Sequence, residues 1–172
     1  MTQAAVSTQE VVNFDLSSES VPQAPVQVFK NPIPVAVLLV PVVAVDPKDG
    51  IEKLGVLTVR RGIEPQKGFL ALPGGYMGYE TWRAAGRREL MEETGLVLAP
   101  ETPIELLNIE SVRESTRIII FGETPPIREE ALTGFLPNEE VQELQIIFGP
   151  EELAFSTHTD AVRDFFSRGA AH

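Results

Sequence analysis

The chain contains no cysteine among its 172 residues. This absence excludes a disulfide framework, a thiolate zinc site, an iron–sulfur cluster and a cysteine nucleophile. A chain without thiols suits the reducing cytosol, and we expect a cytoplasmic location.

Basic residues are scarce as well. Lys and Arg number 14 against 25 Asp and Glu, which gives a formal net charge of −11. The field of such a chain repels polyanions, so we expect no binding to nucleic acid or to an anionic membrane surface. An acidic protein can still act on phosphates when metal ions bridge the two like charges.

Long apolar runs are also missing. The most apolar stretch, residues 33–45, is interrupted by Pro34 and Pro41 and is too short to span a bilayer. Residues 1–10 are polar and lack the basic and apolar regions of a signal peptide. We therefore expect no membrane segment.

The composition that remains is typical of one globular domain. Hydrophobic residues make up 43% of the chain and charged residues 23%. Residues 1–30 differ from the rest because they are rich in Ser, Gln, Val and Pro. They are either a flexible tail or an arm that adds a strand to a sheet, and we place the folded domain at residues 31–172.

Within the domain, the patterns predict mostly strands and two helices. The helices are expected at residues 81–94, with Gly95 as the stop, and at residues 158–168. His158, near the start of the second helix, is expected at the surface. Strands are expected at residues 35–45, 54–59, 69–72, 96–98, 105–112, 117–121 and 143–148. This order favours an α+β fold over a doubly wound parallel sheet.

The first helix carries a cluster of carboxylates. Glu89 and Glu93 are one turn apart, and Glu92 lies three residues after Glu89, so all three can project from one face. A solvated charged face is one interpretation. Neutralisation by cations is the other, and oxygen ligands suit Mg²⁺ or Mn²⁺ better than zinc. Gly74 and Gly75, just before the helix, let the backbone turn tightly and approach a ligand closely.

The joint spacing decides between these interpretations. The segment from Gly74 to Leu96 fills every defined position of a Nudix box. Its order is Gly74, five residues, Glu80, seven residues, Arg88-Glu89-Leu90, one residue, Glu92-Glu93, one residue and Gly95-Leu96. Over about residues 30–168 the chain resembles the Nudix hydrolase family. The resemblance implies a mixed β-sheet sandwiched between helices, and a hydrolase that cleaves a nucleoside diphosphate linked to another moiety with the help of Mg²⁺ or Mn²⁺.

The resemblance also implies roles for single residues. The metal ligands would be Glu89, Glu92, Glu93 and the carbonyl group of Gly74, with Glu92 counted among the catalytic residues as well. Arg88 would orient a carboxylate of the box, and Glu80 would support the metal shell or a coordinated water. Gly86 would let the helix lie close to the sheet.

The catalytic base lies outside the fixed positions of the box. In relatives it is a box glutamate or a glutamate well downstream, and here Glu139, Glu140 and Glu143 are the downstream candidates. Glu140 is favoured by its position relative to Phe148. An acidic surface loop is the alternative interpretation of this cluster.

The substrate is left open by the sequence. The stretch around Pro73-Gly74-Gly75-Tyr76 resembles NADH and ADP-ribose pyrophosphatases, but the chain lacks the four-cysteine zinc ribbon of the former. A nucleotide-derived small molecule is the expected substrate, and a homodimer is the expected assembly. The alternatives are a Nudix module that senses a nucleotide without turnover and an interaction scaffold that uses the N-terminal arm.

Overall fold

A computed structural model describes residues 31–112 and 116–169. The expected tail or arm at residues 1–30 lies outside the described residues. The described part contains two sheets and two α-helices, α1 (Trp82–Thr94) and α2 (Ser156–Gly169). No helix in these ranges is both long enough and apolar enough to cross a membrane.

The first sheet has four strands in the order β5-β1-β7-β6. Its central pair, β1 and β7, is parallel, and both outer pairs are antiparallel, so the sheet is mixed. The strands are β1 (Ile33–Leu39), β5 (Gly74–Tyr76), β6 (Glu105–Val112) and β7 (Arg117–Glu123).

The second sheet has the order β4-β3-β2-β8, and β9 pairs with the long strand β3. The strands are β2 (Pro41–Val45), β3 (Glu52–Arg61), β4 (Leu70–Ala71), β8 (Ile127–Arg128) and β9 (Val141–Ile147). A short 3-10 helix, η2 (Glu129–Leu132), follows β8. Neither β8 nor η2 is among the strands and helices expected from the sequence.

One bent stretch of chain joins the two sheets. The sequence predicts a single strand over residues 35–45, but the structure divides it into β1 and β2 at Val40. The Val40 carbonyl group accepts the N–H of Leu57 in β3, and Pro41 has no N–H to donate. The backbone therefore leaves one sheet at this point and enters the other.

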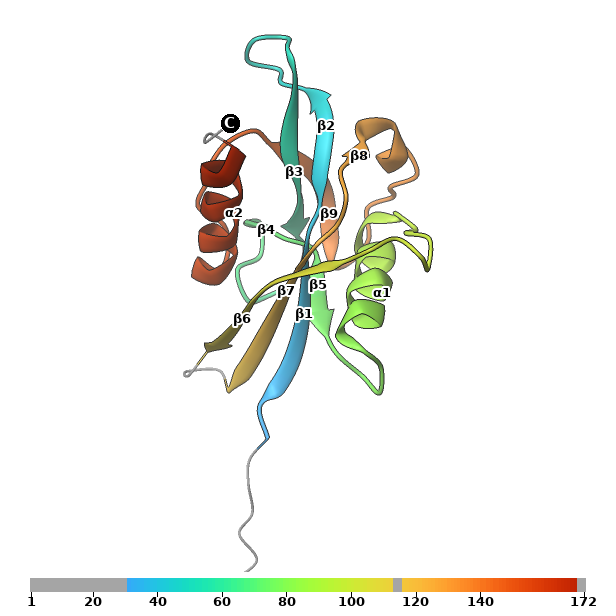
Figure 1. Cartoon of the computed structure of the whole chain (residues 1–172), viewed down its shortest axis with the longest axis vertical. Helices are drawn as coiled ribbons and strands as arrows, with labels where there is room; N and C mark the ends of the chain where they lie inside the picture. Colours follow the sequence, from blue (N-terminus) through green and yellow to red (C-terminus); the bar gives the residue numbers. More distant parts are fainter. Residues whose placement is uncertain (1–30, 113–115, 170–172) are drawn as a thin grey trace, which may run out of the picture. The chain divides into compact units, whose positions relative to one another are not determined.

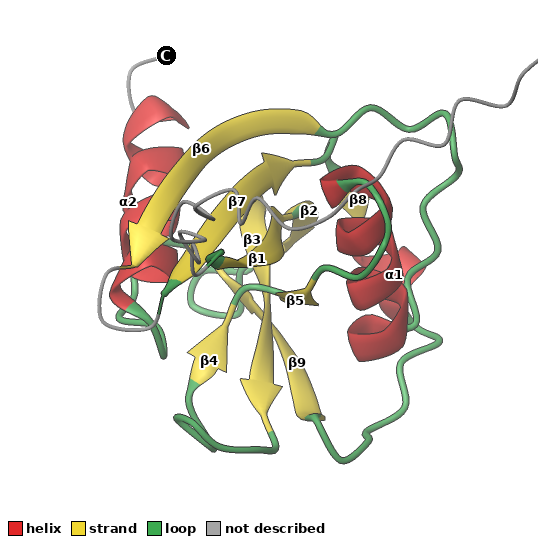
Figure 2. Cartoon of the chain, turned by 90° about the horizontal axis from the view of Figure 1, so that it is seen from below, coloured by secondary structure: helices red, strands yellow, loops and turns green. Residues whose placement is uncertain are grey.

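The sheets lie between the two helices, as Figures 1 and 2 show. Alternation along β1 sends side chains to both sides. Val37 and Leu39 pack in one core cluster with Val162 and Phe165 of α2. Leu38 packs in a second cluster with Leu90 of α1. The predicted α+β fold, with a mixed sheet sandwiched between helices, is confirmed.

Two local predictions are wrong. Residues 96–98 form no strand, because Leu96 packs into the second core cluster while its N–H bonds back to the Thr94 hydroxyl group at 3.1 Å. Gly74 and Gly75, expected to form a tight turn, lie in β5 instead. Gly74 pairs with Val37 and Tyr76 with Val35 in antiparallel register, which aligns this glycine-rich segment beside β1.

Candidate metal-dependent active site

Helix α1 has a cap at each end and packs closely against β1. Thr81 accepts the N–H of Ala84 on its side-chain oxygen at 3.2 Å, and Gly95 ends the helix with φ of 74°. A Cβ at Gly86 would lie 3.0 Å from the side chain of Leu38 in β1. The missing side chain at Gly86 therefore allows α1 to lie close to the sheet, as predicted.

Glu89 and Glu93 turn inward from α1 and are largely buried, with exposed fractions of 9% and 7%. The N–H of Gly74 in β5 donates to Glu93 Oε2 at 2.9 Å. A Cβ at Gly75 would lie 2.5 Å from the carboxyl carbon of Glu89. Only glycine at position 75 leaves room for this carboxylate beside the β5 backbone, so β5 and α1 together form an oxygen-lined cradle.

Burial makes the charge of these carboxylates costly. Desolvation raises the pKa of Glu93 to about 8, and the nearby charges of Glu89 and Glu140 add to the rise. The Gly74 N–H and the charge of Arg61 oppose it. Desolvation also raises the pKa of Glu89, against the effect of its ion pair with Arg88. The metal-free chain therefore keeps Glu93 protonated at neutral pH, and basic groups do not fully compensate its ionised form.

Arg88 connects the remaining carboxylates of the box. Its guanidinium group contacts Glu80 Oε1 at 2.7 and 3.1 Å, Glu89 Oε1 at 2.6 Å and Glu92 Oε2 at 3.0 Å. It also donates to the Tyr76 carbonyl group of β5 at 2.9 Å. Its hydrogen bond holds the pKa of Glu80 below the usual range. One arginine therefore fixes three glutamates and the adjoining strand in a single network.

The donor set fits a hard divalent cation. It consists of carboxylates and backbone carbonyl groups, which Mg²⁺ and Mn²⁺ prefer over thiolate or imidazole. Among the described residues, Glu93 forms no ion pair with Lys, Arg or His, so a cation would find its charge unneutralised. Across residues 31–112 and 116–169, however, no three acidic or histidine side chains are already gathered as a metal cluster. Arg88 holds Glu89 and Glu92 instead.

The downstream loop brings Glu140 toward this cradle. The charge of Glu140 raises the pKa of both Glu89 and Glu93, and its carbonyl group accepts the N–H of Gly62 at 2.6 Å. Glu143 instead pairs with Arg60 at 2.8 Å. Of these two candidates, Glu140 is the one whose charge is felt by Glu89 and Glu93.

Asn138 holds this loop in place, and the sequence prediction missed it. Its Oδ1 accepts the N–H groups of Glu140 and Val141 at 2.9 and 2.8 Å, and its amide group donates to the Glu92 carbonyl group of α1 at 3.3 Å. The Pro137-Asn138 pair is a turn signal that could have identified the position. The link to α1, 46 residues away, leaves no local sequence pattern.

A cavity of about 430 Å³ opens beside the cradle and is lined by both Gly74 and Gly75. Arg61 lies on this cavity with its guanidinium carbon 5.2 Å from the ring centre of Phe155. Across it, Arg117 donates to the Tyr76 hydroxyl group at 2.6 Å. Apolar walls and two guanidinium groups thus adjoin the carboxylates.

His158 also lines this cavity, and its predicted surface position is wrong. The residue is 6% exposed, because the first turn of α2 packs against the sheet. Its ring lies edge-on to Phe121, with the ring centres 5.7 Å apart.

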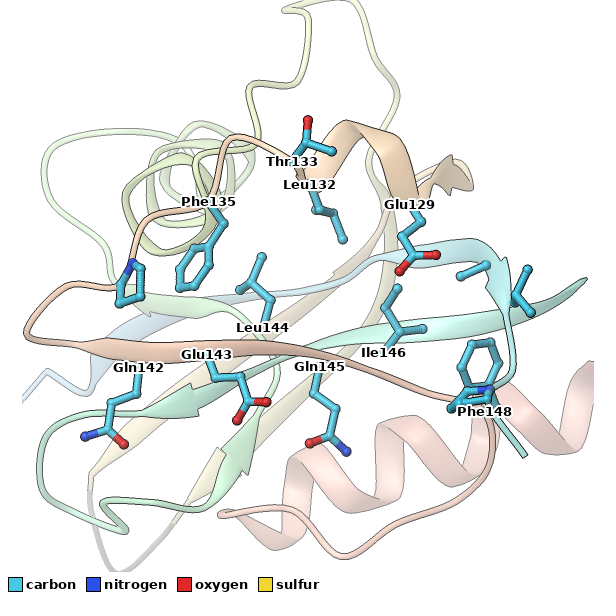
Figure 3. Close-up of a pocket in the computed structure, with 14 residues that line it drawn as sticks. Glu129, Leu132, Thr133, Phe135, Gln142, Glu143, Leu144, Gln145, Ile146 and Phe148 are labelled. Atoms are coloured by element: carbon cyan, nitrogen blue, oxygen red, sulfur yellow. The ribbon is translucent and has the colours of Figure 1, made fainter. Parts of the chain in front are cut away.

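A larger hollow of about 770 Å³ lies elsewhere, between β9 and the segment around η2. Figure 3 shows Leu132, Phe135, Leu144 and Ile146 around it, with Glu129 and Glu143 at its edge. None of the α1 carboxylates lines it. We place the chemistry at the smaller cavity, because that cavity adjoins the oxygen-lined cradle.

Comparisons with known proteins agree with the fold. A family model described as NUDIX domain matches residues 36–168. A MutT/nudix family protein from Enterococcus faecalis is 19% identical with a TM-score of 0.67, covering 87% of this chain and 66% of its own. One from Listeria innocua is 20% identical with a TM-score of 0.62, covering 81% and 94%.

A third solved structure is the NUDIX domain of Shewanella oneidensis NrtR complexed with ADP ribose. It is 20% identical with a TM-score of 0.62, and the match covers 81% of this chain and 90% of that one. At these identities the structures establish the fold. A search of curated proteins found no match.

Proposed function

Since the chain belongs to the Nudix hydrolase family, we propose that it hydrolyses a phosphoanhydride bond of a nucleoside diphosphate linked to another moiety. One observation carries this proposal: the buried carboxylate of Glu93 lies in a glycine-lined cradle with Glu89, beside a cavity that is large enough for a nucleoside. Carboxylates that are costly to ionise without a cation suit a site that binds cations and phosphate oxygens together.

The residues proposed to hold the cation are Glu89, Glu92, Glu93 and the Gly74 carbonyl group. A bound Mg²⁺ or Mn²⁺ would neutralise diphosphate oxygens and lower the pKa of a coordinated water. The chain's own contribution is orientation. Arg88 holds Glu80, Glu89 and Glu92 in fixed directions, and hydrogen bonds between charged groups of this kind are strong.

Glu140 is the proposed general base for the attacking water. Its support is electrostatic proximity to Glu89 and Glu93, together with the loop geometry that Asn138 imposes. A base must lie within hydrogen-bond reach of the water that it deprotonates, which fixed loops favour. Arg61, whose charge reaches Glu93 from the cavity side, is placed to contact the substrate's phosphates.

ADP-ribose and NADH are the favoured substrates. The support is the likeness of the Pro73–Tyr76 stretch to pyrophosphatases of these compounds, and the similar fold of a NUDIX domain that was solved with ADP ribose. We further propose a homodimer and a cytoplasmic location, which follow from family habit and from the composition.

A substrate screen tests the proposal. The purified chain is incubated with Mg²⁺ or Mn²⁺ and ADP-ribose, NADH, dinucleoside polyphosphates, nucleotide sugars or nucleoside triphosphates, and the products are separated by anion exchange. We expect metal-dependent release of a nucleoside monophosphate from one class. Glu143→Gln serves as a matched control, because Glu143 pairs with Arg60 and should not affect turnover.

The same screen addresses the sensing alternative. A chain that binds ADP-ribose in calorimetry but releases no product with either metal would be a nucleotide sensor. A chain that neither binds nor cleaves any compound would contradict the proposed function.

A further inference from the structure

His158 is a buried polar residue that the proposed chemistry does not use. It lies in the first turn of α2, between the rings of Phe121 and Phe155, whose centres are 5.7 and 5.1 Å from its own. Both rings meet it at steep angles, 85° and 62°, so the imidazole is held in one orientation by apolar neighbours.

The tautomer of His158 is set by one hydrogen bond. The backbone N–H of Leu72 donates to His158 Nδ1 at 3.1 Å, so Nδ1 carries no proton. Burial lowers the pKa of His158 to about 3, and the charge of Arg61 adds to the effect. The ring is therefore neutral near pH 7, and its proton resides on Nε2.

The Nε2–H group is the polar group of the ring that is left for a ligand. Among the described residues it has no hydrogen-bond acceptor, since the only side-chain hydrogen bond of His158 is the one from Leu72. Nε2 is not fully buried. In residues 31–112 and 116–169, Arg87 Nε is the one side-chain nitrogen or oxygen atom that is fully buried and has no hydrogen-bond partner. Nε2 therefore keeps some accessible surface, and the cavity is the space that His158 lines.

The walls of the cavity indicate what can accept this proton. Val37, Leu72, Ile119 and Phe155 supply apolar and aromatic surface to the cavity that His158 lines, together with the guanidinium groups of Arg61 and Arg117. A nucleobase is flat and apolar on its faces, and it presents ring nitrogens or carbonyl oxygens at its edge. The aromatic and aliphatic walls beside His158 suit the flat face of a base better than the hydroxyl groups of a ribose.

We propose that His158 is a specificity residue, whose Nε2–H donates to an acceptor atom on the nucleobase of the substrate. The proposal rests on the proposed function, because Gly74 and Gly75 join this cavity to the carboxylate cradle. A donor with a fixed tautomer favours an acceptor at that point of the base and disfavours an amino group, which would face it with a second donor.

Nuclear magnetic resonance on the whole chain tests the geometry directly. The sequence contains only two histidines, His158 and His172, so ¹⁵N-histidine labelling gives two imidazoles to assign. We expect one of them to be a neutral Nε2–H tautomer, and its signal to be missing in His158→Asn. Adding AMP should shift this Nε2–H signal, whereas ribose 5-phosphate and inorganic phosphate should not. A shift with ribose 5-phosphate alone, or no shift with AMP, would overturn the proposal.

Two variants test the roles of Nδ1 and Nε2 of His158 separately. His158→Asn can place an oxygen near Nδ1 and keep the Leu72 contact, but it removes the Nε2–H donor. We expect KM for the substrate found in the screen to rise about tenfold with kcat within about twofold, as for a lost binding contact. His158→Gln can keep a donor near Nε2 and lose the Leu72 contact. It should lower the melting temperature while keeping KM closer to that of the wild type.

The outcomes distinguish this proposal from the proposed function. If the wild-type chain hydrolyses a substrate and His158→Asn leaves its KM unchanged, the role of His158 is wrong and the function stands. If the wild-type chain hydrolyses nothing but AMP still shifts the Nε2–H signal, the function fails and the nucleobase contact stands.

Discussion

Replacing Glu93 by glutamine should stabilise the metal-free fold while it removes activity. Glutamine keeps a carbonyl oxygen for the Gly74 N–H but carries no charge into the buried cradle. A pKa raised from 4.5 to about 8 corresponds to about 5 kcal/mol of unfavourable free energy for the ionised form, at about 1.4 kcal/mol per unit. Because relaxation around the carboxylate lowers this cost, we expect Glu93→Gln to gain about 2 to 5 kcal/mol at pH 8.5.

The sign of the pH dependence makes this prediction specific. Below pH 4.5 Glu93 is protonated in both the folded and the unfolded chain, so it costs nothing. Between pH 4.5 and about 8 the unfolded chain ionises at this position while the folded chain does not, and stability falls with rising pH. The advantage of Glu93→Gln should therefore be small at pH 4.5 and grow up to about pH 8.

Urea denaturation in EDTA at pH 4.5, 6.5 and 8.5 measures this effect. Glu92→Gln is the matched control, because Glu92 is half exposed and its pair with Arg88 contributes about 0.5 kcal/mol or less. Adding Mg²⁺ should stabilise the wild type but not Glu93→Gln. If Glu93→Gln were no more stable than the wild type at pH 8.5, the assignment of Glu93 as a strained, unneutralised carboxylate would be wrong.

Three further substitutions test the cradle and its supports. Gly75→Ala should weaken Mg²⁺ binding about tenfold or more in calorimetry, because the added Cβ would collide with the Glu89 carboxylate. An unchanged affinity for Mg²⁺ would contradict the close approach of Glu89 to the β5 backbone. Arg88→Lys keeps the charge but loses the contacts of the branched guanidinium group with several carboxylates. We expect kcat to fall about tenfold to a hundredfold with little change in melting temperature. Full activity of this variant would exclude an orienting role for Arg88. Asn138→Ala should lower kcat about tenfold by releasing the Glu140 loop, whereas Asn138→Asp, which keeps both acceptor contacts, should retain more activity.

The part of the site that the sequence predicts well is local. The sequence predicts a helix over residues 81–94 with Gly95 as the stop, and the structure has α1 at Trp82–Thr94 with Thr81 as its N-cap. Once a helix is assigned, its period places Glu89 and Glu93 on one side and lets Arg88 reach Glu92 one turn later. The close approach at Gly86 is what the resemblance to the family implies, and the structure shows it against Leu38.

The part that the sequence does not predict depends on distant pairing. Gly74 and Gly75 look like a turn, and only the neighbouring β1 shows that they are extended and form a strand. His158 looks like a surface residue, because its partner Leu72 is 86 residues away in the sequence. Asn138 belongs to a turn whose link to α1 is visible only in three dimensions. In each case the deciding contact joins segments that no local pattern connects.

The network around Arg88 explains how one helix can carry so much negative charge and still fold. Arg88 neutralises Glu80, Glu89 and Glu92 in part, so the cost of charge is concentrated at Glu93, the deepest of the four. Any cation that binds Glu93 relieves this cost, and its binding is therefore coupled to the stability of the fold. The pH at which the chain loses stability should consequently be higher with Mg²⁺ than in EDTA, by an amount that the same urea titrations measure.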